Sequence, residues 1–372
     1  MKMSNKYAEI SKVKISTLNK NGKTILDDVY FTSPFKVAPP FYKSNDFIKV
    51  IIMSSSAGTM DGDIQDYEIS LGDNTKMELT SQSFEKIHTM IDDEATRDCS
   101  IYVGKNSRVT LIHCDDSYNE NRSFSNNVTE IFIDEDAHVE HYKMQNMNNN
   151  SGLINHNYIA MQRGASLLSN SISLNGGNIR NHNEVRMLGE HCETQMHGLY
   201  LMDKEQRIDN YVYVEHAFPN CTSNELFKGI LDDSSRAAFN GHVLVCEHAS
   251  KTDAVQSNKN ILLTDKAIVD SKPFLEIYND DVKCSHGSTI GQLDETALFY
   301  IRSRGISERT AKTLLMYAFC DEVIQKIEIK ALADRLSDMV KKRLHGELTV
   351  CDECALHCSV PECKFEIDIT KV

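Results

Sequence analysis

The chain has 372 residues, of which 41% are hydrophobic and 25% are charged, and its formal net charge is −14. This is the composition of an ordinary globular protein, with room for two or three domains or for one elongated domain. The negative charge argues against nucleic-acid or anionic-membrane binding, which requires a basic surface. No apolar run approaches the ~20 residues that span a bilayer, and the N-terminus lacks an apolar signal core, so we expect a cytoplasmic protein with reduced thiols.

Residues 8 to about 300 are predicted to be mostly β-structure. Short segments rich in β-branched and aromatic residues recur, such as Val128–Ile133 and Tyr211–Val214, and turn residues separate them. Between Gly104 and Gly189 the turns recur roughly every 25 to 30 residues, about the length of one coil of a β-solenoid. The pattern leaves a β-sandwich as the alternative. Segments dense in Asn, such as Asn146–Asn150, indicate either Asn ladders between stacked coils or solvated loops.

After Asp294 the pattern becomes helical. Asp294 is placed to cap a helix over residues 295–303 that Gly305 would end, and Ser307 is placed to cap a second helix. The expected buried faces are those of Ala311, Leu314, Leu315, Ala318 and Val323 in the second helix, and of Leu332, Leu336, Met339, Val340 and Leu344 in a third. A helical end on a β-body indicates either a docking domain or a cap over the open sheet edge.

The most distinctive candidate site is the pair Cys284 and His286. If a strand runs through Lys283, both side chains project to one face, because side chains in a strand alternate with a period of two. A thiolate beside an imidazole suits a transition metal such as iron or zinc. Two ligands do not complete a coordination sphere, so the others would come from elsewhere in the chain or from a partner. The alternative is a buried cysteine beside an ordinary histidine.

Four of the eleven cysteines crowd the end of the sequence, at Cys351, Cys354, Cys358 and Cys363. The Cys-x2-Cys start suits tetrahedral thiolate ligation, so this tail would hold zinc or a labile iron–sulfur cluster. The later spacings match no standard ferredoxin pattern, and the alternative is a redox-sensitive end of the chain. The sequence contains no nucleotide-binding loop, so any ATP hydrolysis would belong to a partner.

From about residue 99 to residue 358 the chain resembles the SufD branch of the SufB/SufD family of iron–sulfur cluster assembly scaffolds. The resemblance is carried by the segment around Cys284 and His286 and by longer strings in the same order, including His216–Gly229, Gln256–Leu263 and Phe299–Gly305. It implies a mainly β protein with no enzymatic activity: a right-handed parallel β-helix core over residues 99–293, a helical partner-docking domain over residues 294–346 and a Cys-rich tail over residues 347–372.

The SufD resemblance also implies protein partners for the chain and a role for Cys284 and His286. A SufD-like subunit would form a heterodimer with a SufB-like subunit, and its C-terminal helices would dock the ABC-type ATPase SufC. His286, with Cys284 beside it, would lie at the interface with SufB. A transient iron–sulfur cluster, or iron, would be assembled there.

The first part of the chain, residues 1–98, resembles a different family, the urease accessory protein UreD. The resemblance is carried by Leu26–Lys36, Met53–Asp63 and Leu79–His88. It implies a further β segment and an alternative function, in which the chain docks urease accessory partners during nickel delivery to urease. Since both resemblances imply stacked β-coils, the two parts would join into one continuous solenoid.

Overall fold

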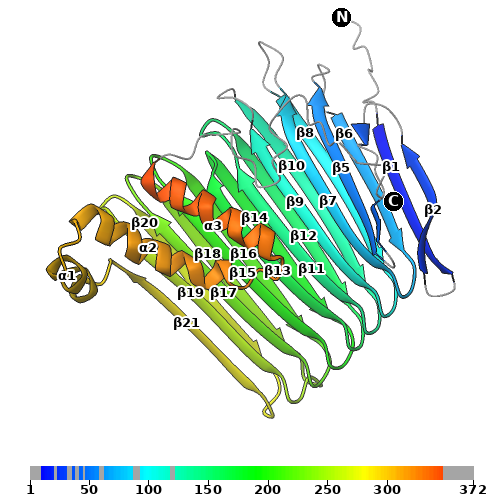
Figure 1. Cartoon of the computed structure of the whole chain (residues 1–372). Coiled ribbons are helices and arrows are strands. Elements are labelled where there is room, and N and C mark those ends of the chain that lie inside the picture. The colour runs from blue at the N-terminus through cyan, green and yellow to red at the C-terminus, as the bar shows by residue number, and fades with distance from the viewer. Residues whose placement is uncertain are drawn as a thin grey trace, which may run out of the picture.

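The computed structural model describes residues 10–20, 23–31, 36–37, 42–44, 47–57, 63–86, 93–117 and 122–346. Its strands form two long sheets, and three helices follow them (Figure 1). Sheet A contains β1 (Ile10–Lys20), β2 (Lys23–Phe31), β6 (Asp63–Leu71), β8 (Asp93–Val103), β10 (Ser123–Ile133), β12 (Gly152–Met161), β14 (Asn178–Met187), β16 (Arg207–His216), β18 (Arg236–Val245) and β20 (Ile268–Ile277).

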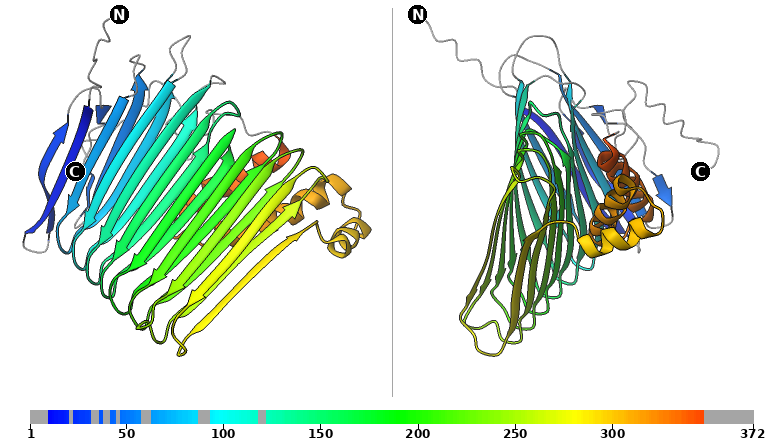
Figure 2. Two further views of the ribbon diagram at one scale, coloured as in Figure 1. Left: turned by 180° about the vertical axis from the view of Figure 1, so that it is seen from behind. Right: turned by 90° about the vertical axis from the view of Figure 1, so that its left-hand side faces the viewer.

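Sheet B contains β3 (Lys36–Val37), β4 (Tyr42–Ser44), β5 (Phe47–Ala57), β7 (Lys76–Lys86), β9 (Arg108–Ser117), β11 (His138–Asn146), β13 (Ser166–Asn175), β15 (Glu193–Met202), β17 (Thr222–Leu231), β19 (Asp253–Leu262) and β21 (Lys283–Gly291). The helices are α1 (Glu295–Ser303), α2 (Glu308–Ile324) and α3 (Lys330–His345). The right-hand view of Figure 2 shows the two sheets as opposite walls, with the helices outside one of them.

From β5 onward the chain alternates between the sheets, so that each coil contributes one strand to each wall, and successive strands of a wall pair in parallel. The register places Val103 beside Ile133, Ile133 beside Met161 and Met161 beside Met187, which are steps of 30, 28 and 26 residues. The predicted solenoid is therefore confirmed and the sandwich alternative is wrong, since neighbouring strands come from successive coils.

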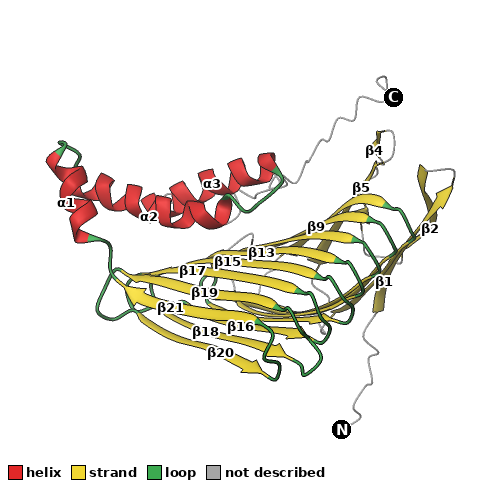
Figure 3. Cartoon of the chain, turned by 90° about the horizontal axis from the view of Figure 1, so that it is seen from below, coloured by secondary structure: helices red, strands yellow, loops and turns green. Residues whose placement is uncertain are grey.

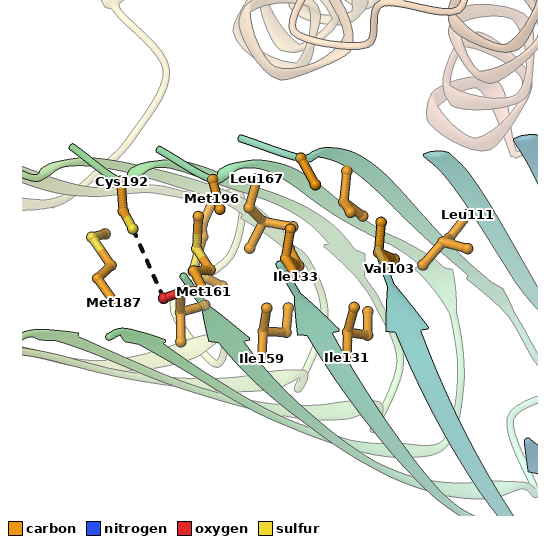
Figure 4. Close-up of a cluster of buried hydrophobic side chains, with 14 of the residues drawn as sticks. Val103, Leu111, Ile131, Ile133, Ile159, Met161, Leu167, Met187, Cys192 and Met196 are labelled. Carbon is orange, nitrogen blue, oxygen red and sulfur yellow. Dashed lines mark hydrogen bonds between the residues drawn. The ribbon is translucent and has the colours of Figure 1, made fainter. Parts of the chain in front are cut away.

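Rows of apolar side chains fill the space between the walls. In β10 and β12, Ile131 stacks on Ile159 and Ile133 stacks on Met161, and all four are at most 3% exposed (Figure 4). The residues between them point outward, because side chains alternate along a strand. Each coil thus buries a strip that matches the strip of the next coil, which sets the register of the stack.

Polar rows lie inside the solenoid as well. Asn127, Asn155, Asn181 and Asn210 occupy matching positions of four successive coils, and each donates from Nδ2 to the next, over 2.9, 3.2 and 3.0 Å. The Asn ladders expected from the sequence are present at these buried positions. The segment Asn146–Asn150 instead contains both environments, since its first residue is buried and its last two are exposed at a corner.

The predicted helix ends are confirmed. The carboxylate of Asp294 accepts hydrogen bonds from the backbone N–H groups of Thr296 and Ala297, and the hydroxyl of Ser307 accepts one from Thr310. Gly305 has a φ of +85°, a conformation that glycine adopts without a steric penalty. No helix in the described part of the chain is long and apolar enough to cross a membrane.

The helices α2 and α3 cover the outward face of sheet B (Figure 3). The predicted stripe of α3 is confirmed, but that of α2 is wrong at Leu314, which is 46% exposed, and at Ala318. The buried residues of α2 are Ala311, Met316, Cys320, Val323 and Ile324. Sheet B exposes an apolar outer face that must be covered, and this contact selects the face of α2. The edge-cap interpretation is therefore wrong for α2 and α3.

Candidate functional site at the terminal coil

Both walls end at the last coil. The strand β20 is the end of sheet A and β21 is the end of sheet B, so each has a hydrogen-bonded neighbour on one side only within the described residues (Figure 1). The outer edges of both strands present unpaired backbone N–H and C=O groups, and such an edge is a template for pairing with another chain. The terminal coil is therefore the natural place for a protein partner.

Cys284 and His286 lie on β21 and point to the interior side of this terminal coil. The register pairs Cys284 with Ala254 and His286 with Gln256, and both partners are buried inside the solenoid. Cys284 is half-buried against a small apolar cluster that includes Val243. His286 is exposed and makes no hydrogen bond or ion pair with another described residue. The structure thus places a thiol and an imidazole side by side on the open end.

The environment of Cys284 sets its proton affinity. Burial raises the pKa of the Cys284 thiol, and the charge of Asp253 adds to this, while a backbone hydrogen bond from Ala254 opposes it. The thiol therefore keeps its proton at neutral pH in the isolated chain. A metal ion bound here would have to displace that proton, since the thiolate is the ligand.

A polar pair lies directly behind His286, in the two preceding coils. Gln256 donates from Nε2 to Oε2 of Glu225 over 2.8 Å, and both side chains are buried. Burial raises the pKa of Glu225 to about 8, against a smaller lowering by the hydrogen bond from Gln256. No sequence pattern indicates this pair, because its members are 31 residues apart and only the register brings them together.

Two groups of charged residues join the helices to sheet B. Lys228 is 3% exposed, donates to the backbone carbonyl of Phe319 over 2.8 Å and forms an ion pair with Glu322. Burying an ammonium group is costly unless it is paired. Since it is paired here only by α2, this contact ties the helical part to the solenoid.

The second group is the only set of three metal-ligating side chains that lie together in the described part of the chain, and it consists of His138, Glu140 and Glu328. The guanidinium of Arg108 lies 3.0 Å from a carboxylate oxygen of Glu140 and 3.0 Å from one of Glu328. Glu140 also accepts a hydrogen bond from Tyr142. The arginine already supplies the positive charge that the two carboxylates need, so the group acts as an ion-pair network.

The predicted metal ligands of the tail, Cys351, Cys354, Cys358 and Cys363, lie outside the described residues. The structure therefore locates only the Cys284 and His286 pair among the site residues expected from the sequence.

Comparison with known proteins identifies the larger part of the chain. Residues 87–319 match the family model described as the SUF system FeS cluster assembly, SufBD core domain. The chain belongs to the SufBD family. The terminal coil with Cys284 and His286 lies inside this SufBD core, as do the helix α1 and most of α2.

Individual relatives agree. The chain is 34% identical over 244 residues to the iron–sulfur cluster assembly protein SufD of Escherichia coli, covering 66% of this chain and 58% of that protein. It is 33% identical over 252 residues to an iron–sulfur cluster assembly SufBD family protein of Synechocystis sp., covering 65% of this chain and 55% of the relative. The chain thus spans somewhat over half the length of these relatives.

Residues 11–115 also match the family model of the UreD urease accessory protein. The two matches overlap over residues 87–115, which contain β8 and most of β9. Both resemblances inferred from the sequence are therefore confirmed, and the strands of the UreD-like part continue the same two sheets.

Proposed function

We propose that this chain is a non-catalytic, SufD-like scaffold subunit for the assembly of iron–sulfur clusters in the cytoplasm. The observation that carries the proposal is the Cys284 and His286 pair on the open terminal coil of a SufBD core. A SufB-like subunit would pair with the free edges of β20 and β21. The iron–sulfur cluster would be assembled at this subunit interface and then transferred to another protein, so it is the substrate of the scaffold and not a resident cofactor.

The incomplete ligand set supports a shared site. Cys284 and His286 offer one sulfur and one imidazole nitrogen, while iron in a cluster is usually four-coordinate. A partner subunit that pairs with β21 would bring further ligands next to these two side chains. Because burial raises the pKa of Cys284, ligation would release a proton, and loading would weaken as the pH falls.

The helices suit a second partner. Four large apolar side chains stand exposed on α1, on α2 and between them, and the most exposed are Phe299 at 74% and Tyr300 at 59%. The other two are Ile306 and Leu314. Exposed apolar side chains grouped in this way mark interaction surfaces. We propose that residues 294–346 form a docking domain for a SufC-like ABC ATPase, which would supply the ATP hydrolysis.

The experiment is co-expression with SufB-like and SufC-like subunits, followed by purification and anaerobic cluster reconstitution. His286→Ala should leave the complex intact and lower the cluster yield, while the exposed His248→Ala serves as a matched control. An unchanged cluster yield in His286→Ala would refute the site assignment. Failure to bind either subunit would refute the scaffold function itself.

The Cys-rich tail has its own test within this proposal. We propose that Cys351, Cys354, Cys358 and Cys363 hold zinc or a labile iron–sulfur cluster. Replacing all four by serine should lower the metal content of the purified chain by about one ion or one cluster per chain. An unchanged metal content would leave the tail cysteines without a metal-binding role.

The UreD match over residues 11–115 favours a second candidate function, which is nickel delivery as a urease accessory protein. A pull-down that offers both partner sets separates the two candidates. Capture of urease or its accessory proteins, without SufB-like and SufC-like subunits, would replace the first proposal by the second.

A further inference from the structure

The outward face of sheet A is turned away from the helices (Figure 3). A row of arginines lies on this face. Arg207 at the start of β16 and Arg236 at the start of β18 are register neighbours, and both are exposed. Neither guanidinium forms an ion pair with a carboxylate of the described residues. Like charges on directly opposed positions of a sheet repel each other. The chain has a net charge of −14, yet the charges of Arg207 and Arg236 are not compensated, so an anionic group would bind favourably here.

The two arginines line a long trough across the starts of six sheet A strands, from β10 to β20. Its volume is about 720 Å³, and it adjoins a second hollow of about 770 Å³ at the corner, which shares Arg207 and Arg236 as lining residues. The basic residues of the two hollows are Arg122, Arg180, Arg207, Arg236 and Lys204, and the acidic ones are Asp209, Asp270 and Glu205. Asp209 is already paired with Arg180 over 3.3 Å. The trough is therefore basic and open.

The last helix ends at the rim of this trough. In the final turn of α3, Arg343 donates to the backbone carbonyl of Leu174 over 2.7 Å and pairs with Asp203 over 2.8 Å. Asp203 directly precedes Lys204, which lines the second hollow. Figure 1 shows this end of α3, in red, beside the corner of the solenoid. The segment after Gly346 therefore starts next to the arginine row.

The segment after Gly346 is acidic, as a partner of the arginine row would need to be. Its 26 residues contain six carboxylates and two lysines. Near its end, Phe365–Ile369 alternates apolar and acidic residues, so that in an extended conformation Glu366 and Asp368 point to one side. The intervening residues reach roughly 60 Å when extended, so length does not limit access to the trough.

We propose that the acidic segment Phe365–Ile369 of this chain docks on the arginine row, with Glu366 and Asp368 paired with Arg207 and Arg236. Charge-assisted hydrogen bonds between guanidinium and carboxylate groups are among the stronger polar contacts. The tether raises the effective concentration of the acidic segment at the trough, so weak contacts suffice. Docking would hold the four tail cysteines close to the same corner of the solenoid.

Zero-length cross-linking of the full-length chain tests whether the acidic segment docks on the arginine row. A carbodiimide joins a carboxylate to a neighbouring amine without a spacer, and Lys204 lies in the hollow beside Arg207 and Arg236. Mass spectrometry should find Lys204 joined to Glu366 or Asp368. Mixing isotopically light and heavy protein separates links within one chain from links between two copies.

Charge reversal gives the decisive variants. Arg207→Glu with Arg236→Glu should lower the yield of the Lys204 link about tenfold, whereas Arg309→Glu on α2 should leave it unchanged. Adding Glu366→Lys and Asp368→Lys to the double reversal should restore docking, now seen as links between the new lysines and the new glutamates.

Three results would overturn the proposal. The first is a tail whose carboxylates link to other lysines but not to Lys204. The second is a Lys204 link found in light–heavy form at the level that random pairing of chains gives, because the occupant would then be a second copy. The third is a link that survives reversal of both Arg207 and Arg236. Circular dichroism of each variant confirms that its solenoid is folded.

Discussion

Gln256 donates a 2.8 Å hydrogen bond to Glu225, and the side chain of Gln256 is in turn the register neighbour of His286. A carboxyl group buried inside the solenoid therefore lies two coils behind the exposed imidazole. Burial raises the pKa of Glu225 to about 8, so the group stays largely protonated at neutral pH. The interior of the solenoid behind the candidate site is therefore polar but uncharged at neutral pH.

The stability of the chain should therefore depend on the charge state of Glu225. Its folded pKa of about 8 lies above the ordinary glutamate value of 4.5, so its protonated form favours folding, and that contribution is lost as the pH rises from 4.5 to 8. Glu225→Gln keeps an acceptor for Gln256 but cannot ionise. Relative to the wild type, the variant should gain stability with rising pH, by up to ~1.4 kcal/mol per pH unit.

Urea unfolding of both proteins at pH 5, 6, 7 and 8 measures this difference. Parallel stability profiles across that range would show that Glu225 does not titrate as its burial implies. The same variant also tests whether Glu225 contributes to cluster yield in the reconstituted complex.

Glu140 should show the opposite pH dependence. Burial alone would raise its pKa, but the nearby imidazole of His138 and hydrogen bonds from Arg108 and Tyr142 outweigh burial and lower the pKa to about 2. Its contribution to stability is present above pH 4.5 and is lost as the pH falls towards 2. Glu140→Gln should cost roughly 1–3 kcal/mol at pH 7 and much less near pH 3. Urea titrations at both values check this, and an equal loss at each would contradict it.

Gly198 leaves room for the ring of Phe227 in the neighbouring strand. A Cβ at position 198 would lie 2.2 Å from Cδ1 of Phe227, whose side chain is 2% exposed. We expect Gly198→Ala to destabilise the chain by about 1–3 kcal/mol, since the buried ring has no free space to move into. Gly287→Ala is the matched control, because a Cβ there meets nothing within 4 Å. Thermal unfolding should lower the melting temperature of the first variant only.

The Asn ladder should be sensitive at its centre. Asn181 exchanges hydrogen bonds with Gln145, Asn155 and Asn210 inside the solenoid. Asn181→Ala leaves these buried groups short of partners and should cost at least ~2 kcal/mol in urea unfolding. The outward-facing Asn240 makes no side-chain hydrogen bond to a described residue, so Asn240→Ala should change stability by less than ~0.5 kcal/mol. Similar losses in both variants would argue against a structural ladder.

Local features of the chain follow from sequence alone. The recurrence of turns every 25 to 30 residues predicts the coils, since a coil of fixed width needs a nearly fixed number of residues. The caps at Asp294 and Ser307 and the apolar stripe of α3 are also predicted, because capping and helix periodicity depend on residues within a few positions of one another. The alternation in β21 places Cys284 and His286 on one face for the same reason.

What the tertiary structure decides is which distant residues meet. The pairing of Glu225 with Gln256 and the row of Arg207 and Arg236 depend on the lengths of whole coils, because one residue more or less in a corner would turn each side chain to the other face. The buried face of α2 was mispredicted at Leu314, since its burial depends on contact with the apolar outer face of sheet B. Sequence periodicity determines the coils and the helix ends, and only stacking determines the contacts between them.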